Sequence, residues 1–454
     1  MKVWEASDYL AQTCLRHIEL LPDLLRRGDL DRPYEPGEIQ QRLTTRLTET
    51  QDEASLAQCL RRYRQQQMVR IIWRDIARLA PLEEILEDLS ALADACIEEA
   101  LRLLYGWACR EMGTPRNGDG DAQPLVVLGM GKLGARELNL SSDIDLIFAY
   151  PEAGQTDGPR RLSNEQFFAR LCQRLVQALG NHTGEGFVFR VDTRLRPFGS
   201  VGPLAMNFSA MESYYGSQAR EWERYAMIKA RVVAGDARAG MELTAMLRPF
   251  VYRRYLDFGA IESLREMKQL ISSELHKKGM QANIKLGPGG IREIEFIGQA
   301  FQLIRGGRDT ALQIRPIIAV LQVLQAHELL PDYVVRELTE AYRFLRLVEN
   351  RLQAWQDRQT HLLPTDAAER LRLAHAMDFD TWDDFFPVLE SHRKRVQGHF
   401  DMVFAAPQTE TETATQPLSG VWQGSMDPEH ALAALLSAGF VHPEAALKQL
   451  ERFR

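Results

Sequence analysis

The spacing of apolar residues predicts long helices in the first quarter of the chain. Between positions 56 and 79 there is no Pro or Gly, and Met68, Ile72 and Ile76 recur at the spacing of one helix face. A second helical pattern begins at Pro81, which suits a first helical turn because its missing N–H is not needed there. The arginines of the first pattern are interpreted as a solvated or salt-bridged face rather than a binding patch.

The pattern changes after the loop-forming residues 113–122, and short apolar runs bounded by Gly and Pro then predict strands. These runs are Leu125–Leu128, Ile144–Tyr150 and Phe187–Asp192. Between the second and third runs, Ser163 and Gln166 have the spacing of a capping box, which predicts a helix that ends near Gly180. Strands and helices that alternate in this way predict a small α/β domain.

These patterns together predict an α+β fold, in which a small sheet domain is flanked by N-terminal helices and a C-terminal helical bundle. The predicted boundaries follow the changes of pattern and the polar, low-complexity segment 406–417. They are an N-terminal helical region over residues 1–115, a catalytic sheet domain over 116–250, a helical bundle over 251–405, a linker over 406–426 and the start of a further helical region over 427–454.

The charges and cysteines exclude several classes of protein. The chain carries 55 Lys and Arg against 62 Asp and Glu, so it lacks the basic surplus with which proteins bind nucleic acid. Its five cysteines form no C-x-x-C pair, which argues against a disulfide framework and against a zinc ribbon. No apolar run approaches the roughly 18 residues of a membrane span, and the N-terminus does not resemble a signal peptide. We therefore expect a soluble, cytoplasmic protein that binds neither nucleic acid nor membrane.

One glycine-rich segment and one pair of aspartates carry the chemistry. Gly129-Met-Gly-Lys-Leu-Gly134 follows a predicted strand, a pattern also found in dinucleotide-binding folds. A Rossmann unit, however, has a long helix after the glycines and an acidic residue about 20 positions on, whereas here Asp143 and Asp145 come much sooner. Because residues i and i+2 of a strand share one face, the two carboxylates project together. This arrangement indicates a Mg²⁺ site rather than a ribose clamp.

Asp192 is the candidate for a third carboxylate, because it follows the apolar strand 187–191. If that strand pairs beside the strand of the aspartate pair, the three aspartates form a triad that can hold two metal ions. Arg194 and Arg196 follow at alternate positions, and Arg presents a planar fork of donors that suits phosphate oxygens. Each aspartate taken singly is more simply a cap or a strand-end salt bridge, but together these residues favour phosphate chemistry.

The G-x-G…D-x-D…D arrangement resembles the DNA polymerase beta-type nucleotidyltransferase superfamily. More narrowly, the chain resembles the glutamine synthetase adenylyltransferase/adenylyl-removing enzymes over roughly residues 1–405, in the segments LGMGKLGARELNLSSDIDLIF, VDTRLRPFG, WERYAMIKAR and NIKLGPGGIREIEF. That family carries two nucleotidyltransferase units in one chain, whereas a single S-D-x-D occurs here. Met130, Asn139 and Phe198 resemble the amino-terminal unit, which removes AMP.

The resemblance implies phosphorolysis, in which inorganic phosphate removes AMP from a tyrosine of glutamine synthetase and gives ADP. It implies a Mg²⁺ cofactor, held by the catalytic and metal-binding residues Asp143, Asp145 and Asp192. Residues expected to bind nucleotide and phosphate are Gly129, Gly131, Lys132, Gly134, Ser142, Arg194, Arg196 and Lys229. The expected partners are glutamine synthetase, a PII-type nitrogen signal protein, ADP or ATP, and phosphate.

Several alternatives stay open at this point. One is an enzyme that transfers AMP from ATP onto glutamine synthetase, and another is a non-catalytic scaffold that docks glutamine synthetase and the signal protein. Lys132 is as readily a solvated lysine as a phosphate ligand. The segment Trp222–Arg231 either brings Lys229 to a nucleotide or is a helix or strand that packs on the sheet with its cations solvated. The segment Lys285–Phe296 is either a plain glycine turn before a helix or a wall of the active cleft that contacts adenosine.

Overall fold

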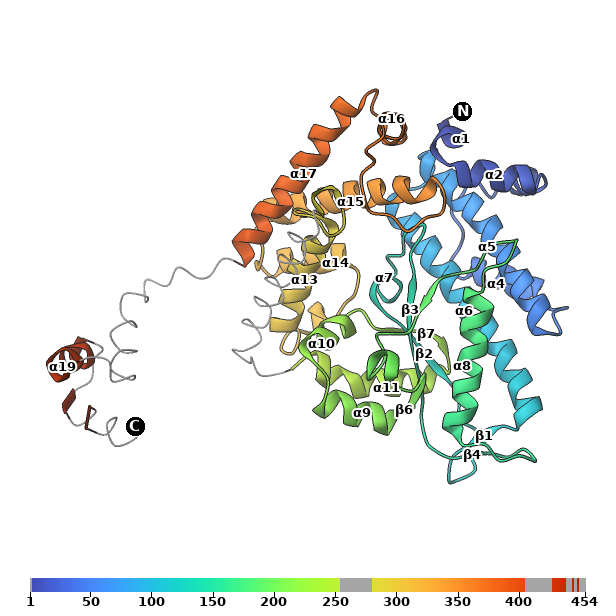
Figure 1. Ribbon diagram of the computed structural model, residues 1–454, viewed down its shortest axis with the longest axis horizontal. Helices are drawn as coiled ribbons and strands as arrows, with labels where there is room; N and C mark the ends of the chain where they lie inside the picture. The colour runs from blue at the N-terminus through green and yellow to red at the C-terminus, as the bar shows by residue number, and fades with distance from the viewer. Residues whose placement is uncertain (1, 254–279, 405–426, 438–442, 445–446, 449–454) are drawn as a thin grey trace. The chain divides into compact units, whose positions relative to one another are not determined.

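Figure 1 shows the computed structural model of the chain. The structure describes residues 2–253, 280–404, 427–437, 443–444 and 447–448. Internal contacts distinguish two compact units, Met1–Phe400 and Asp401–Arg454. The predicted linker over 406–426 lies outside the described residues. No helix in the described part of the chain is long and apolar enough to cross a membrane.

Helices make up the N-terminal region of the first unit, as the apolar pattern predicted. They are α1 (Lys2–Ala6), α2 (Asp8–Arg16), α3 (Leu20–Arg26), α4 (Glu38–Arg46), α5 (Glu53–Ile76) and α6 (Leu82–Met112). α5 begins at a capping box formed by Asp52 and Ser55, which satisfies N–H groups of the first turn. α6 follows Pro81, which is its N-cap residue.

A mixed five-stranded sheet lies at the centre of the first unit. Its strands are β2 (Val126–Gly129), β3 (Ile144–Tyr150), β5 (Val191–Asp192), β6 (Ala205–Asn207) and β7 (Arg231–Gly235). The strand order is β5-β3-β2-β7, and β6 pairs with the far end of β3. β2 is antiparallel to both of its neighbours, whereas β5 and β6 run parallel to β3. A separate ladder joins β1 (Pro115–Arg116) and β4 (Gln155–Thr156).

The sequence predicted β2 and β3 but only the end of β5, and it missed β6 and β7. The predicted strand Phe187–Asp192 is too long, because the N–H groups of Val188 and Phe189 donate to the carbonyl of Leu179 rather than to the sheet. Leu179 lies in α8 (Asn164–Gly180). This helix and the capping box of Ser163 that begins it are both confirmed. β7 begins directly after the turn that follows α10, within the segment expected to be either helix or strand.

Apart from β6 and β7, the described chain after β5 is mostly helical. Its helices in the first unit are α9 (Phe208–Ser217), α10 (Glu221–Met227), α11 (Ala237–Val251), α13 (Ile291–Arg305), α14 (Ile317–Ala326), α15 (Asp332–Ala354), α16 (Ala367–Ala376) and α17 (Trp382–Val403), with short 3₁₀ turns η1 (Gly199–Val201), η2 (Met280–Ala282) and η3 (Thr310–Leu312). The second unit contains α19 (Pro428–Ser437), in which Ala431, Ala434 and Leu435 are buried together. The predicted α+β fold with flanking helical regions is therefore confirmed.

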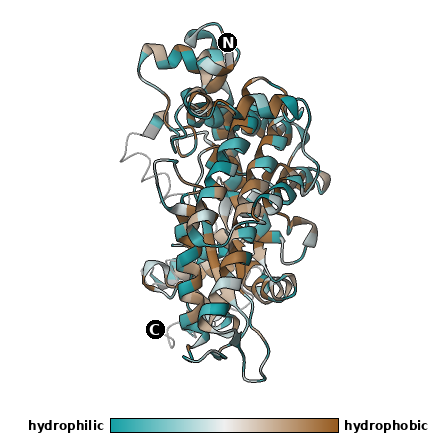
Figure 2. Ribbon diagram, turned by 90° about the vertical axis from the view of Figure 1, so that its right-hand side faces the viewer, coloured by the Kyte–Doolittle hydropathy of each residue, from teal (hydrophilic) through white to brown (hydrophobic). Residues whose placement is uncertain are grey.

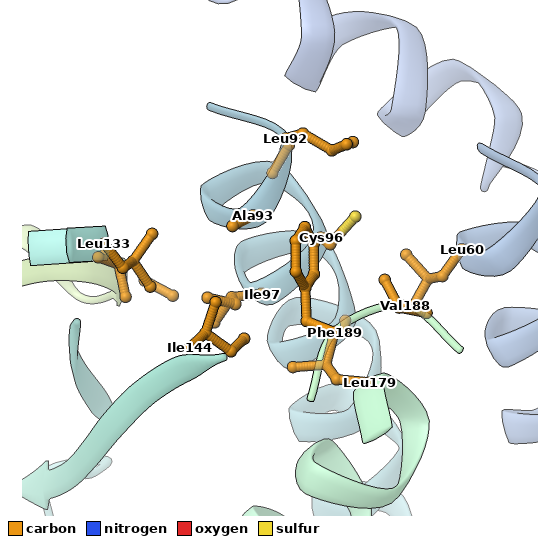
Figure 3. Close-up of a cluster of buried hydrophobic side chains, with 14 of the residues drawn as sticks. Leu60, Leu92, Ala93, Cys96, Ile97, Leu133, Ile144, Leu179, Val188 and Phe189 are labelled. Carbon is orange, nitrogen blue, oxygen red and sulfur yellow. The ribbon is translucent and has the colours of Figure 1, made fainter. Parts of the chain in front are cut away.

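The core surrounds the sheet on both faces. Gly240 of α11 lies directly against Val232 of β7, which pairs with Leu128 of β2, whereas the neighbouring Val127 of β2 joins the cluster that contains α6. Since successive strand residues point to opposite faces, α6 and α11 cover opposite faces of the sheet. Strands in the middle of the molecule are hydrophobic, and the surrounding helices alternate between polar and apolar positions (Figure 2). Figure 3 shows Ile97 of α6 beside Ile144 at the start of β3.

Candidate active site

The three predicted aspartates lie at one end of two neighbouring strands. Asp143 immediately precedes β3, and Asp145 is its second residue. β5 runs parallel to β3, with Asp192 paired in register with Asp145, so the predicted pairing of these strands is confirmed. Ile144 is fully buried in the core (Figure 3), and alternation along the strand turns Asp143 and Asp145 to the other face.

The three carboxylates differ in their partners. Asp143 accepts a hydrogen bond from Nε of Arg190 at 2.7 Å. Asp192 accepts hydrogen bonds from the backbone N–H of Arg194 at 2.8 Å and from its guanidinium at 2.5 Å, and this pairing lowers the pKa of Asp192. Asp145 has no hydrogen bond or ion pair through its carboxylate with any described residue. Burial and the charges of the other two aspartates raise its pKa to about 6.

A divalent cation fits this set of donors. Carboxylate oxygens are the ligands that Mg²⁺ prefers, and Asp145 supplies a largely buried anion that a bound cation would stabilise. Among the described residues, no three acidic, His or Cys side chains are already gathered in a position to hold a metal ion. The reason is that Asp143 and Asp192 are each turned toward an arginine. A metal ion would compete with Arg194 for both oxygens of Asp192, whereas Asp143 accepts from Arg190 through Oδ1 alone.

The glycine turn lies against Asp145, but its three glycines act differently. Gly131 has a φ of +54°, and a Cβ at this position would lie 3.5 Å from Oδ2 of Asp145. A Cβ on Gly129 would lie 2.6 Å from a side-chain atom of β7, and one on Gly134 would lie 1.8 Å from the carbonyl oxygen of Lys229. Gly129 and Gly134 thus permit close packing, whereas Gly131, in α7 (Gly131–Gly134), faces the site.

A cleft of about 580 Å³ opens beside Asp143 and Asp145, whereas Asp192 is not among its lining residues. Six of the predicted residues line it, namely Gly131, Lys132, Ser142, Asp143, Asp145 and Lys229. Its remaining lining residues are Leu195, Trp222, Tyr225, Ala226, Lys285, Leu286, Arg292, Glu295, Gln299 and Gln359. Most of these belong to the segments WERYAMIKAR and NIKLGPGGIREIEF, so the interpretation of the second segment as a cleft wall agrees with the structure. Gln359, in the loop after α15, carried no signal in the sequence.

Lys132 is tied to the helical bundle. Its ammonium group donates to both carboxylate oxygens of Glu349 in α15, at 2.8 and 3.0 Å, and to the amide oxygen of Asn139 at 2.7 Å. All three ammonium protons are therefore used by the protein. Burial lowers the pKa of Lys132 to about 7, although Glu349 opposes this shift.

Lys229 is also buried and paired. It donates to Glu295 of α13 at 2.6 Å and to Glu137 at 3.1 Å. Burial alone would lower the pKa of Lys229, but the two glutamates outweigh burial and raise it to about 12. The charge of this lysine is thus balanced by the wall of the cleft in which it lies.

Arg194 and Arg196 lie in the loop beyond Asp192 and are not among the residues that line the cleft. Arg194 is exposed and folds back onto Asp192. The guanidinium of Arg196 donates to the carbonyl oxygens of Thr193 at 2.7 Å and Gly202 at 3.2 Å, so it holds this loop together. Both arginines are thus engaged within their own loop, and their predicted contact with phosphate stays a prediction.

Two protein families match the chain. Residues 1–246 match the family described as Glutamate-ammonia ligase adenylyltransferase, and residues 265–404 match the family described as GlnD PII-uridylyltransferase. Relatives from Nitrosococcus oceani (56% identical over 457 residues), Pseudomonas aeruginosa (53% over 462) and Thioalkalivibrio sulfidiphilus (52% over 461) are each named bifunctional glutamine synthetase adenylyltransferase/adenylyl-removing enzyme. Each alignment covers 100% of this chain but only 47–48% of the relative, so the chain spans about half the length of these proteins.

The first match includes every part of the sheet site. It contains the glycine turn, the three aspartates and all five strands of the sheet, and it covers more than half of the chain. This match agrees with the sequence motifs and with the strand register that aligns Asp145 with Asp192. The chain belongs to the glutamate-ammonia ligase adenylyltransferase family.

Proposed function

We propose that this chain removes AMP from the adenylylated tyrosine of glutamine synthetase by phosphorolysis. The observation that carries the proposal is the register of β3 and β5, which aligns Asp145 with Asp192 beside the glycine turn and the cleft. Met130, Asn139 and Phe198, which resemble the adenylyl-removing unit, support removal rather than transfer. The names of the relatives include both activities, which supports the class of chemistry but not its direction.

The proposed reaction exchanges one phosphoester for a phosphoanhydride. An oxygen of hydrogen phosphate attacks the α-phosphorus of adenylyl-tyrosine, and the bond from that phosphorus to the tyrosine oxygen breaks. The proton of the hydrogen phosphate passes to the leaving phenolate. The products are ADP and unmodified tyrosine, and the charge balances because a monoanionic diester and a phosphate dianion give an ADP trianion.

Asp143, Asp145 and Asp192 would hold Mg²⁺ in this site. When bound, Mg²⁺ supplies positive charge where negative charge develops on phosphoryl oxygens. The fold contributes the placement of the ligands, because hydrogen bonding between β3 and β5 keeps Asp145 and Asp192 in register. Arg190 balances the charge of Asp143, and Arg194 balances that of Asp192, until a cation replaces them.

The other predicted residues are proposed to shape the two ends of the cleft. Gly131 leaves space beside Asp145, and Ser142 and Lys132 line the same wall. Lys229 contributes to the cleft wall a cation that Glu295 neutralises. Gly129 and Gly134 allow the glycine turn to pack closely against β7 and the segment before it. Arg194, after leaving Asp192, and Arg196, through the loop that it holds, are proposed to act at the phosphate end.

We further propose that the activity is cytoplasmic and that a PII-type signal protein regulates it through the helical bundle. The match of residues 265–404 to a PII-uridylyltransferase family supports a connection with PII proteins. In this proposal the catalytic domain covers residues 116–250, the helical bundle 251–405, and the N-terminal helices 1–115.

The decisive experiment supplies the purified chain with adenylylated glutamine synthetase, inorganic phosphate and Mg²⁺, and measures release of ADP. We expect ADP only when phosphate and Mg²⁺ are both present. A parallel reaction with unmodified glutamine synthetase and ATP measures transfer of AMP. Transfer without removal would favour the adenylyltransferase alternative, and the absence of both reactions would favour a scaffold.

A further inference from the structure

Six cationic side chains line the cleft or follow Asp192, and four of them are already engaged. Lys132 and Lys229 donate to glutamates, Arg194 folds onto Asp192, and Arg196 holds its own loop. These contacts compete with a free anion for donors of all four cations. Any contact that is lost offsets part of the free energy gained when one of these four cations binds phosphate.

The other two cations, Lys285 and Arg292, are different. Both line the cleft, and neither side chain forms a hydrogen bond or ion pair with any residue that the structure describes. Lys285 is half-buried and Arg292 is exposed. Their donors are thus available to a ligand without loss of a contact with any described residue.

The glycine turn before α13 brings these two residues together. The N–H of Arg292 donates to the carbonyl of Lys285 at 3.0 Å, so the two side chains leave the backbone at adjacent points. A Cβ on Gly290 would lie 2.7 Å from that same carbonyl oxygen, and one on Gly289 would lie 2.0 Å from a carbonyl of α17. Only glycines permit this close approach, and the turn therefore fixes the pair in the wall of the cleft.

Lys285 lines the same cleft as Asp143 and Asp145. Burial and the neighbouring aspartates raise the pKa of Asp145, and the positive charges of Lys285 and Arg194 oppose that rise. The charge of Lys285 also acts on Lys132 and Glu295. A phosphate bound by Lys285 would therefore lie close to the carboxylates that are proposed to hold Mg²⁺.

We propose that Lys285 and Arg292 form the binding site for the attacking inorganic phosphate, an inference that rests on the proposed phosphorolysis. Two unengaged cations match the two negative charges of hydrogen phosphate, and the planar fork of Arg292 suits two of its oxygens. As the new bond forms, this phosphate becomes the β-phosphate of ADP. The same two residues should therefore distinguish ADP from AMP.

Binding measurements on the full chain test this site without relying on catalysis. A phosphorus NMR titration measures the affinity for inorganic phosphate, with Mg²⁺ present throughout, and calorimetry compares ADP with AMP. We expect Lys285→Gln and Arg292→Gln to weaken phosphate binding about ten- to a hundredfold each, and to weaken ADP more than AMP. Lys285→Arg, which keeps the charge, should retain most of the affinity.

Lys394→Gln and Arg336→Gln provide matched controls, because these residues are exposed on α17 and α15 and do not line the cleft. Unchanged phosphate affinity in the Lys285 and Arg292 variants would overturn the site, as would equal losses in the controls or no phosphate binding by the unmodified chain. The proposed function is judged separately from ADP release. Phosphate binding that depends on both residues without ADP release would contradict phosphorolysis but not the anion site.

Discussion

Buried charges are arranged differently in the N-terminal helices and at the catalytic edge of the sheet. In the helices, Arg70 of α5 pairs with Asp88 of α6 at 2.5 Å, and Arg74 pairs with Glu84 at 2.7 Å. The arginines of α5 thus form a salt-bridged face that is buried except at Arg62. At the sheet edge, Asp145 lies beside two further carboxylates and has no partner among the described residues. A charge that supports the fold is neutralised by the fold, whereas Asp145 is not, which is the arrangement expected of a residue that binds a ligand.

The largest expected effect follows from removing the unmatched charge. We expect Asp145→Asn to lower the rate of ADP release about a thousandfold or more, because the variant loses a charged ligand for Mg²⁺. The same change removes like-charge repulsion, so without Mg²⁺ the variant should unfold at a temperature equal to or higher than that of the unmodified chain. Enzyme assays and thermal unfolding measure the two effects.

Asp119→Asn is the control for this prediction, because Asp119 is exposed in the loop before β2. It should change neither the rate nor the unfolding temperature. An Asp145→Asn variant that keeps full activity at ordinary Mg²⁺ would contradict the assignment of the site. A large loss of stability would instead show that Asp145 is a structural charge like those of the helices.

The opposite result is expected for a paired charge. Arg70→Met leaves Asp88 buried without its partner, and it should lower the free energy of unfolding by about 3–5 kcal/mol. Urea denaturation measures this loss. The double variant Arg70→Met/Asp88→Leu should recover much of the stability, because no isolated charge then remains. If Arg70→Met costs less than about 1 kcal/mol, the contrast between the two regions does not hold.

Much of the catalytic edge could be predicted because its signals are local. The i, i+2 spacing of Asp143 and Asp145 determines their common face, and an apolar run leading to Asp192 indicated the neighbouring strand. The capping box of Ser163 likewise determined where α8 begins. These features depend on residues close together in the sequence.

The partners of charged residues could not be predicted, because they come from distant segments. Lys132 pairs with Glu349, which lies 217 residues further along the chain, and no local pattern connects the two. β7 was missed because its short run of valines follows a helix and pairs with β2 from a distant part of the chain. For the same reason, the segment around Lys285 was interpreted as a glycine turn or a cleft wall, and its cationic side chains were not connected with phosphate binding.

An intermediate effect is expected for Arg194, which is neither buried nor unmatched. Arg194→Ala removes an exposed partner of Asp192, and we expect it to raise the apparent KM for phosphate by up to about tenfold. The KM for adenylylated glutamine synthetase should change little. Steady-state kinetics at varied phosphate concentration measures both values. An increase larger than that caused by Lys285→Gln would place the attacking phosphate at Arg194 instead.

The smallest expected effect concerns the backbone beside Asp145. Gly131 has a φ of +54°, which an alanine adopts only with strain, so Gly131→Ala should lower the free energy of unfolding by about 1–2 kcal/mol. Its new Cβ would lie 3.5 Å from the Asp145 carboxylate, an ordinary contact, so the change narrows the site without displacing the strand. Gly118→Ala, in a loop with open space around the glycine, is the matched control and should leave stability nearly unchanged. If Gly131→Ala lowers ADP release in proportion to its loss of stability alone, Gly131 serves the fold only. A loss of activity in protein that is fully folded would show that the space beside Asp145 is needed for the reaction.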